Sequence, residues 1–193
     1  MHQHSHNAPR TILLTGGTRG IGRATTLALL ARGHRVLFTF QSRQDLARSI
    51  LEAYPETSLG FKCSLEDPQA NQKALTLIEK NFGPLDVLIN NAGVDGNGLL
   101  TEMALPEIMK LVNTNLLGTL NLTQQAIPQL LKSKGQIINI SSIWGHKGAS
   151  CESVYAMTKG AIEQLTTSLA RELGPSGVRS LTVAPGLIDT DMN

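Results

Sequence analysis

Residues 11–22, Thr-Ile-Leu-Leu-Thr-Gly-Gly-Thr-Arg-Gly-Ile-Gly, decide the fold of this 193-residue chain. The apolar run at 11–15 indicates a buried strand, and the amphipathic segment at about 20–32 predicts a helix that ends at Gly33. A strand that runs through a glycine-rich turn straight into a helix is the opening unit of a parallel α/β sheet.

The same alternation continues along the rest of the chain. Apolar runs predict five further strands, at about 35–40, 59–63, 86–90, 136–141 and 178–184. The segments between them predict helices: one that ends near Tyr54, one that begins at Asp67-Pro68, and one each over about 107–131 and 154–173. Strands that are apolar throughout and joined by helices predict a doubly wound parallel sheet of six strands with helices on both faces, a Rossmann fold. We expect residues 1–10 to form a flexible tail and residues 11–193 to form one domain.

Composition excludes several classes of function. The net charge is +2 with no run of basic residues, so we expect neither nucleic acid nor a membrane as partner. No apolar stretch is long enough to span a bilayer and no signal peptide is evident, which predicts a cytoplasmic protein. Two cysteines give no disulfide framework. Alternating histidines at 2, 4 and 6 are typical of a tag-like tail, and we expect no metal site.

Tyr155 and Lys159 lie four residues apart on a predicted helix and therefore share one face. An isolated pair of this kind usually belongs to a solvated surface. Here, however, Ser142 stands at the end of a predicted strand, where parallel sheets present ligand groups, and Asn115 lies upstream. An ammonium beside a phenol favours the phenolate, which predicts a lowered pKa for Tyr155. Ser141 is the alternative to Ser142 at this strand end.

These residues, with the spacing Gly16-x-x-x-Gly20-x-Gly22, resemble the short-chain dehydrogenase/reductase family along nearly the whole chain. The resemblance implies that Tyr155 is the proton donor in ketone reduction, that Lys159 tunes it and holds the nicotinamide ribose, and that Ser142 binds the substrate carbonyl. It also implies that Asn115 helps to hold a water that relays protons to the lysine. Asn113 lies nearby in the sequence and is not the residue that matches the family asparagine.

A dinucleotide is the implied cofactor. Glycine lets the backbone approach a pyrophosphate, and a helix N-terminus offers free N–H groups, although a plain tight turn would look similar. The expected binding residues are Gly16, Thr18, Arg19, Gly20, Ile21, Gly22, Ser42, Arg43, Ser64, Asn91, Ala92, Gly93, Tyr155, Lys159, Pro185, Gly186, Ile188 and Thr190. Asn91, Ala92 and Gly93 belong to an Asn-Asn-Ala-Gly segment that steadies the sheet and lines the adenosine side in the family.

The residues after the second strand favour NADP over NAD. NAD sites usually place an acid here, which would repel a 2′-phosphate, but this chain has none before Asp45. Arg19 and Arg43 suit a phosphate, although either could be a solvated surface arginine. Ser64 stands where the family often has Asp, so its contact with adenine is in doubt.

The substrate is less defined. The chain looks most like 3-oxoacyl-acyl-carrier-protein reductases, which implies acyl carrier protein as a partner and a homo-oligomer. The stretch 141–152, Ser-Ser-Ile-Trp-Gly-His-Lys-Gly-Ala-Ser-Cys-Glu, is similar to reductases that act on 5-aminopentanone-modified elongation factor P. The similarity of this stretch could instead reflect common descent alone, without a shared substrate.

Family members continue beyond Asn193 through a substrate-covering lid and a last strand, which we expect to be missing here. Their loss would leave the sixth strand as an open edge. The alternative from another class is therefore a catalytically inactive dinucleotide-binding or interaction protein.

Overall fold

The structure is a computed structural model that describes residues 8–190. The three histidines of the predicted tail lie outside the described residues, as does most of that tail. Arg10, the last tail residue, accepts a hydrogen bond from the backbone N–H of Arg35 at 2.9 Å, so it already lies against the sheet.

Six parallel strands form one sheet in the order β3-β2-β1-β4-β5-β6. They are β1 (Thr11–Leu14), β2 (Arg35–Phe40), β3 (Ser58–Lys62), β4 (Val87–Asn90), β5 (Gln136–Ile140) and β6 (Arg179–Val183). The strand order reverses between β1 and β4, so the carboxyl ends of these two strands flank the crevice where doubly wound sheets bind ligands. The predicted Rossmann fold is confirmed.

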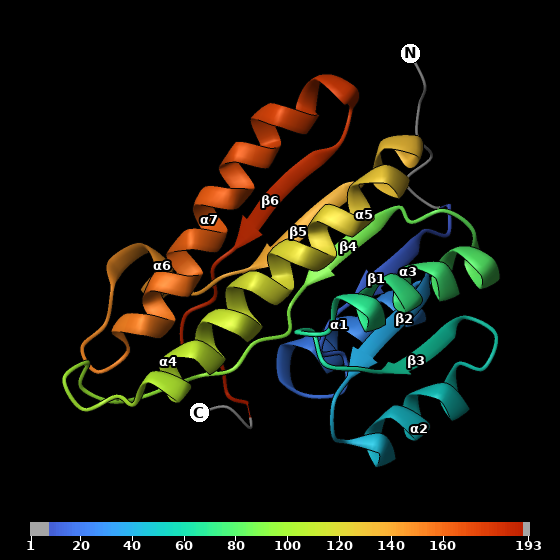
Figure 1. The fold of residues 1–193 in the computed structure, drawn as a ribbon. Coiled ribbons are helices and arrows are strands. Elements are labelled where there is room, and N and C mark those ends of the chain that lie inside the picture. Colours follow the sequence, from blue (N-terminus) through green and yellow to red (C-terminus); the bar gives the residue numbers. More distant parts are fainter. Residues whose placement is uncertain (1–7, 191–193) are drawn as a thin grey trace.

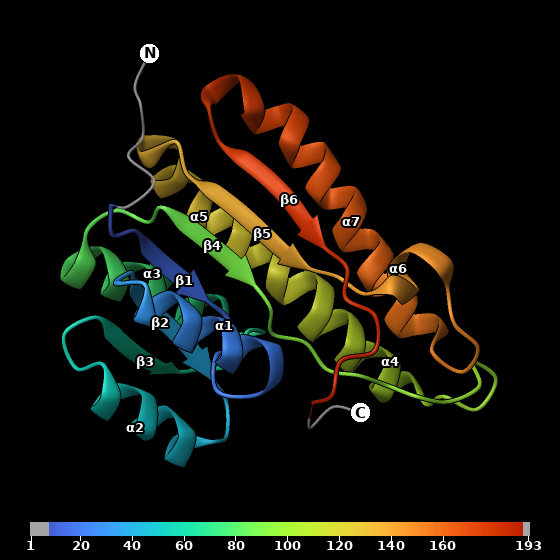
Figure 2. The ribbon, with the colours of Figure 1, turned by 180° about the vertical axis from the view of Figure 1, so that it is seen from behind.

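Helices cover both faces of the sheet (Figures 1 and 2). They are α1 (Gly20–Ala31), α2 (Gln44–Ala53), α3 (Pro68–Phe82), α4 (Leu105–Leu111), α5 (Thr119–Ser133), α6 (Ile143–Lys147) and α7 (Ser153–Leu173), with a π-helical segment at Val112–Gly118 and a 3-10 turn at Gly174–Ser176. Helices α3, α5 and α7 lie on one face, and α1 and α2 lie on the other.

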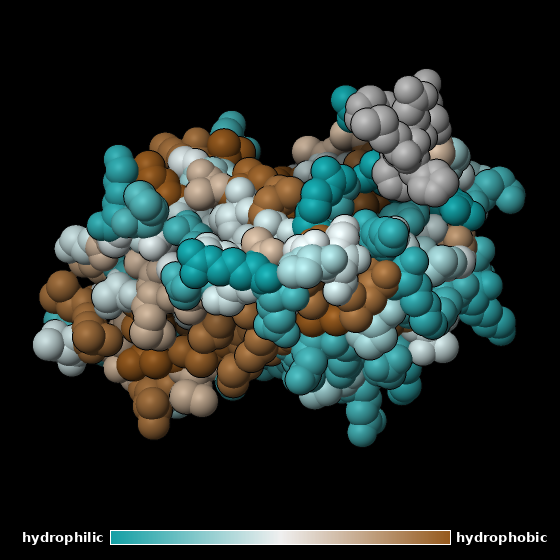
Figure 3. All heavy atoms as spheres, turned by 90° about the horizontal axis from the view of Figure 1, so that it is seen from above, coloured by the Kyte–Doolittle hydropathy of each residue, from teal (hydrophilic) through white to brown (hydrophobic). Residues whose placement is uncertain are grey.

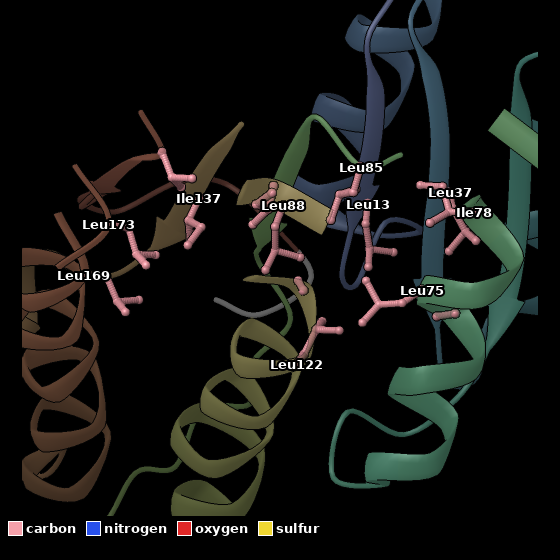
Figure 4. Close-up of a cluster of buried hydrophobic side chains, with 14 of the residues drawn as sticks. Leu13, Leu37, Leu75, Ile78, Leu85, Leu88, Leu122, Ile137, Leu169 and Leu173 are labelled. Atoms are coloured by element: carbon pink, nitrogen blue, oxygen red, sulfur yellow. The ribbon is translucent and has the colours of Figure 1, made fainter. Parts of the chain in front are cut away.

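The alternation of side chains along β1 divides the core in two. Leu13 belongs to the cluster under α3, α5 and α7, which also contains Leu88, Leu122, Ile137 and Leu169 (Figure 4). Its neighbours Ile12 and Leu14 belong to the cluster under α1 and α2. Strands buried on both faces account for the continuous apolar runs in the sequence.

The face that carries α1 and α2 leaves β5 and β6 uncovered in the described part of the chain (Figure 2). Leu181 and Val183 on β6 are 39% and 46% exposed, and they pair in register with Ile138 and Ile140 of β5. β6 is an edge of the described sheet and pairs there with β5. No helix among residues 8–190 is long and apolar enough to cross a membrane.

Two elements near the sheet's carboxyl edge differ from the predicted ones. The predicted helix over 107–131 consists of α4, the π-helical segment and α5 in succession, and the short helix α6 was not predicted. Single π-helical turns inside α-helices are often found at functional sites. This one contains Asn115.

Buried amides tie the central strands to the helices. The Asn90 side chain donates to Asn139 Oδ1 at 2.7 Å and to Thr123 Oγ1 at 2.9 Å, and Asn139 donates to Thr166 Oγ1 at 2.8 Å. These bonds join β4 to α5 and, through β5, to α7. They hold the ends of β4 and β5 in place below the candidate site.

Candidate active site

The predicted site residues meet at the carboxyl edge of the sheet, because parallel strands end on the same side. β1 leads into the glycine turn at 15–22, β4 into residues 91–98, β5 into Ser141 and Ser142, and β6 into residues 184–190. The backbone carbonyl of Pro185 accepts from Ile143 N at 2.9 Å, and Val183 O accepts from Ser141 N at 2.8 Å. The loops after β5 and β6 are therefore joined directly.

The glycine turn needs its glycines for two separate reasons. Gly16 and Gly20 have φ angles of +72° and +47°, which L side chains rarely adopt. A Cβ on Gly22 would lie 2.1 Å from the carbonyl oxygen of Gly16, so only glycine fits there. Arg19 is exposed and forms the N-cap of α1 without a side-chain capping bond, so the first N–H groups of the helix are not capped by that side chain.

Thr15 and Asn91 hold this turn from the direction of β4. Thr15 Oγ1 accepts from the backbone N–H groups of Asn91 and Ala92, both at 3.0 Å. The Asn91 side chain donates in return to Thr15 O at 2.9 Å and to Gly16 O at 3.2 Å. The Asn91 amide thus supports the turn, which agrees with the steadying role expected of this segment. Thr15 was not predicted as a site residue, although a polar residue at the end of a buried strand is a signal for one.

Asn115 is buried and clamps the backbone of Val94. Its Oδ1 accepts from Val94 N and its Nδ2 donates to Val94 O, each at 2.8 Å. A Cβ on Gly93 would lie 3.2 Å from Asn115 Oδ1 and 3.5 Å from Lys159 Nζ, so glycine lets these two groups approach. The described contacts of the Asn115 side chain are thus to the protein backbone and Thr158. Asn113, the nearby asparagine that does not match the family position, is half-buried.

Lys159 is 7% exposed, and its ammonium donates to the carbonyl oxygen of Ile140 at 2.9 Å. Burial lowers the pKa of Lys159 to about 8, because the charged form loses its hydration. The ammonium lies 5.7 Å from the ring centroid of Tyr155. The lysine therefore reaches both the end of β5 and the phenol.

Tyr155 is half-buried, and its phenol lies beside the Ser142 side chain. Burial raises the pKa of Tyr155, a hydrogen bond with Ser142 acts to lower it, and the carboxylates of Glu152 and Asp95 raise it. The expected lowering of the Tyr155 pKa by Lys159 is wrong for the chain alone, because burial outweighs the hydrogen bond with Ser142 that favours the phenolate. A raised pKa keeps the phenol protonated at neutral pH, as a proton donor requires.

The two adjacent serines are held differently. Ser141 Oγ donates to Glu163 Oε1 at 2.8 Å and lies 3.2 Å from the carbonyl oxygen of Lys159, so it is directed at α7. Ser142 Oγ faces Tyr155 and accepts from Trp144 N at 3.2 Å as the N-cap of α6. Of the two candidates, Ser142 is the one whose hydroxyl adjoins the phenol.

The residues predicted for the adenosine end are more exposed. Ser42 and Arg43 follow β2, and the Arg43 guanidinium makes two hydrogen bonds with Asp45, at 3.0 and 2.8 Å. This pair holds the pKa of Asp45 at about 2. Ser64 Oγ accepts from Glu66 N at 3.3 Å and is thus engaged within its own loop.

The loop after β6 approaches the glycine turn from the other side. A Cβ on Gly20 would lie 3.3 Å from two carbon atoms of Thr190. Gly186 and Ile188 are exposed between this contact and Pro185. The loop therefore spans from the end of β5 to the start of α1.

The arrangement fits a dinucleotide. Gly20 at the start of α1 is exposed, Gly16 and Gly93 are half-buried, and the Arg19 side chain does not cap the first N–H groups of the helix, so backbone is accessible where a cofactor needs close approach. Thr18 is buried and Ile21 half-buried within the turn. The structure brings the turn, residues 91–93 and the loop 185–190 together, while Ser42, Arg43 and Ser64 lie at the ends of β2 and β3.

Comparison with known proteins agrees with this geometry. The pattern of the short chain dehydrogenase family matches residues 10–193. Carbonyl reductase family member 4 of Danio rerio is 36% identical over 184 residues, which cover 95% of this chain and 77% of that protein. The 3-oxoacyl-[acyl-carrier-protein] reductase FabG of Staphylococcus aureus is 36% identical over 187 residues, covering 95% and 76%.

Solved structures give the same result. A short chain dehydrogenase from Burkholderia cenocepacia, crystallised in complex with NADP, superposes with a TM-score of 0.90 at 33% identity. The match covers 96% of this chain and 76% of that one. With the sheet order, the glycine turn and the sequence matches in agreement, the chain belongs to the short-chain dehydrogenase/reductase family of oxidoreductases.

Proposed function

We propose that this protein reduces a ketone to an alcohol with NADPH, and that its substrate is a 3-oxoacyl thioester carried by acyl carrier protein. The observation that carries the proposal is the meeting of three groups at one sheet edge. The hydroxyls of Ser142 and Tyr155 adjoin each other, and the ammonium of Lys159 lies 5.7 Å from the phenol ring. The relative in Staphylococcus aureus named for this activity supports the substrate class.

In this proposal each residue has one task. The bound nicotinamide cofactor supplies the hydride. Ser142 donates a hydrogen bond to the substrate carbonyl oxygen, which stabilises the negative charge that develops there. Tyr155 donates its phenolic proton to the same oxygen, and the Lys159 ammonium stabilises the phenolate that remains. Asn115 fixes Val94 and so the loop that borders the phenol.

NADP is the proposed cofactor because the residues after β2 include no acid before Asp45. That acid already binds Arg43, so a 2′-phosphate would compete with the Asp45 carboxylate for the guanidinium. Arg19 at the start of α1 is the second cation. The NADP-bound Burkholderia cenocepacia neighbour supports the same choice.

The first test is binding of NADPH and NADH by fluorescence, followed by NADPH oxidation with an acetoacetyl thioester. Tight binding of NADPH with turnover is the expected result. Cofactor binding without turnover of any ketone would favour the alternative of an inactive dinucleotide-binding protein. If neither cofactor binds, the proposal fails.

One observation favours a second substrate. The carboxylates of Asp95 and Glu152 both raise the pKa of the Tyr155 phenol. Neither carboxylate has an ion-pair partner among residues 8–190. Gly98 N donates to Cys151 O at 2.7 Å, so the two loops that carry these acids are tied together beside the site. Negative charge here suits a substrate with an amine, such as aminopentanone-modified elongation factor P, better than a phosphorylated carrier arm.

A pair of ketones of matched length, one with a terminal amine and one with a terminal carboxylate, separates these substrates. Preference for the amine that is lost in Asp95→Asn with Glu152→Gln would favour the elongation factor. Turnover of the carboxylate ketone that equals or exceeds turnover of the amine ketone in both proteins would favour the substrate carried by acyl carrier protein.

We also propose that the protein forms a homo-oligomer. Large apolar side chains are exposed on α4, the π-helical segment, α5 and α7: Leu105, Met109, Leu117, Leu120 and Met157. We call these residues the helical apolar face. Figure 3 shows hydrophobic residues gathered over a broad area of the surface. Exposed apolar area of this kind is typical of a protein–protein interface.

A further inference from the structure

Glu163 continues the row formed by the two functional residues of α7. Tyr155, Lys159 and Glu163 follow one another at intervals of four residues, so they lie on one face of the helix. The Glu163 side chain is 25% exposed, which is low for a carboxylate, and nothing in the proposed mechanism uses it.

The carboxylate of Glu163 is bound to the end of β5. Ser141 Oγ donates to Glu163 Oε1 at 2.8 Å, and Lys159 Nζ donates to Ile140 O at 2.9 Å. Helix α7 therefore holds two consecutive residues of the chain just before Ser142. These two bonds fix how the end of β5 lies along the helix.

The segment that follows β5 packs closely against α7 at Gly145. A Cβ there would lie 2.8 Å from the carbonyl carbon of Lys159 and 2.9 Å from Ser141 Oγ. The chain thus leaves β5, is held by α7 at residues 140 and 141, and returns to the helix at Gly145. Ser142 stands between the points of attachment.

Glu163 does not act by tuning Lys159. The lowered pKa of Lys159 has burial as its cause, and the ammonium is directed at Ile140 O. The second oxygen of Glu163 lies 3.9 Å from Nδ1 of His146, an exposed side chain. The one short contact of the carboxylate in the described structure is with Ser141.

We propose that Glu163 is a positioning residue, which sets the place of the Ser142 hydroxyl relative to Tyr155 by holding Ser141. The effect on turnover rests on the proposed reductase function, whereas the effect on the phenol does not. Because hydrogen bonding through Ser141 carries the role, an uncharged acceptor at position 163 will serve as well as the carboxylate.

The chain offers a direct spectroscopic test, since Tyr54 and Tyr155 are its only tyrosines. In a Tyr54→Phe background, absorbance of the tyrosinate reports Tyr155 alone. In Glu163→Met the Ser142 hydroxyl moves from the phenol, so the pKa of Tyr155 rises further. Glu163→Gln keeps the acceptor and leaves the titration unchanged. The same titration in all three proteins, or a shift in the glutamine variant, would overturn the proposal.

Kinetics test the consequence for turnover. We expect Glu163→Met to lower kcat about tenfold or more while the KM for NADPH stays within about twofold, and Glu163→Gln to retain the rate. Glu172→Ala removes an exposed glutamate from the last turn of α7 and serves as the control. Circular dichroism establishes that each variant is folded.

A double-mutant cycle tests the route through Ser141. Ser141→Ala combined with Glu163→Met should lose no more activity than either change alone, because both remove one bond. If the loss of activity in the double variant equals the product of the two single losses, Glu163 acts through a contact other than Ser141. If the unaltered protein reduces no ketone, the proposed function fails, and the tyrosine titration still decides whether Glu163 places Ser142.

Discussion

Among single side chains, Tyr155 supports the most direct prediction. Replacing it with Phe removes only the hydroxyl that is proposed to give its proton to the substrate. We expect Tyr155→Phe to lower kcat by about a hundredfold or more, the range for loss of a general acid, with the Kd for NADPH nearly unchanged. Stopped-flow turnover and fluorescence titration measure the two quantities. Retained turnover would remove Tyr155 from its role.

Lys159 gives a prediction on pH and stability. Its pKa is lowered from 10.5 to about 8 in the folded chain, so between these values the unfolded chain binds the proton that the native chain has released. Stability therefore rises with pH in this window, and below pH 8 the buried ammonium is unfavourable. Burial raises the pKa of Cys63 from 9.0 to about 11, which has the opposite effect above pH 9.

The interval from pH 8 to 9 isolates the lysine. Relative to Lys159→Met, the unfolding free energy of the unaltered protein should rise by about 1 kcal/mol across it. Urea unfolding, followed by the fluorescence of Trp144, the only tryptophan, measures this difference. Lys110→Met replaces an exposed lysine on α4, and its unfolding free energy should change with pH as that of the unaltered protein does. If the difference in unfolding free energy between the unaltered protein and Lys159→Met stays constant from pH 8 to 9, the burial of the ammonium does not lower its pKa as argued.

Arg43 and Arg19 test the choice of cofactor. Arg43→Ala together with Arg19→Ala should weaken NADPH about tenfold or more and leave NADH within about twofold, because only NADPH has the 2′-phosphate. Asp45→Asn should act in reverse and strengthen NADPH, since the guanidinium loses its competing partner. Equal weakening of both cofactors in the arginine variant would refute the 2′-phosphate assignment.

At the element scale, the turn between β1 and α1 has the least room for change. A methyl group at Gly22 would lie 2.1 Å from Gly16 O and 2.5 Å from the Asn91 amide. We expect Gly22→Ala to destabilise the protein by about 1–3 kcal/mol and to abolish tight cofactor binding. Ser168→Ala, at an exposed position of α7, is the control. Thermal melting and NADPH titration of both variants check the prediction.

The central strands β1, β2 and β4 were predictable because burial on both faces leaves a continuous apolar run, and the outer strands were predictable from shorter apolar runs. All six strands and α7 lie within about two residues of the predicted ranges. Helix α6 was missed because five residues carry no helical period. The π-helical segment was missed because its distinguishing feature is a hydrogen-bond pattern, and the apolar spacing of the sequence does not specify it.

The site shows the same division between local and tertiary information. Tyr155 and Lys159 were identified by their spacing, and Ser142 by its place at the end of a predicted strand and by the family resemblance. The structure brings the three together. The support given by Asn91 to Gly16, and by Glu163 to Ser141, joins residues on different elements. No local pattern predicts such contacts, and the upward shift of the Tyr155 pKa likewise depends on burial that only the fold creates.

At the scale of the whole molecule, two apolar surfaces compete as the interface of the proposed oligomer. The first is the helical apolar face, and the second is the uncovered side of β5 and β6, where Leu181 and Val183 are exposed. The helical apolar face contains more exposed side chains and spans α4, α5 and α7, so we expect it to form the contact.

Leu117→Glu together with Leu120→Glu places two like charges on the helical apolar face and should convert a dimer into a monomer. Leu181→Glu together with Val183→Glu, on β6, should leave the mass unchanged. Light scattering after size exclusion measures both masses against the unaltered protein. A monomer from the β6 variant alone would assign the contact to the uncovered side of β5 and β6.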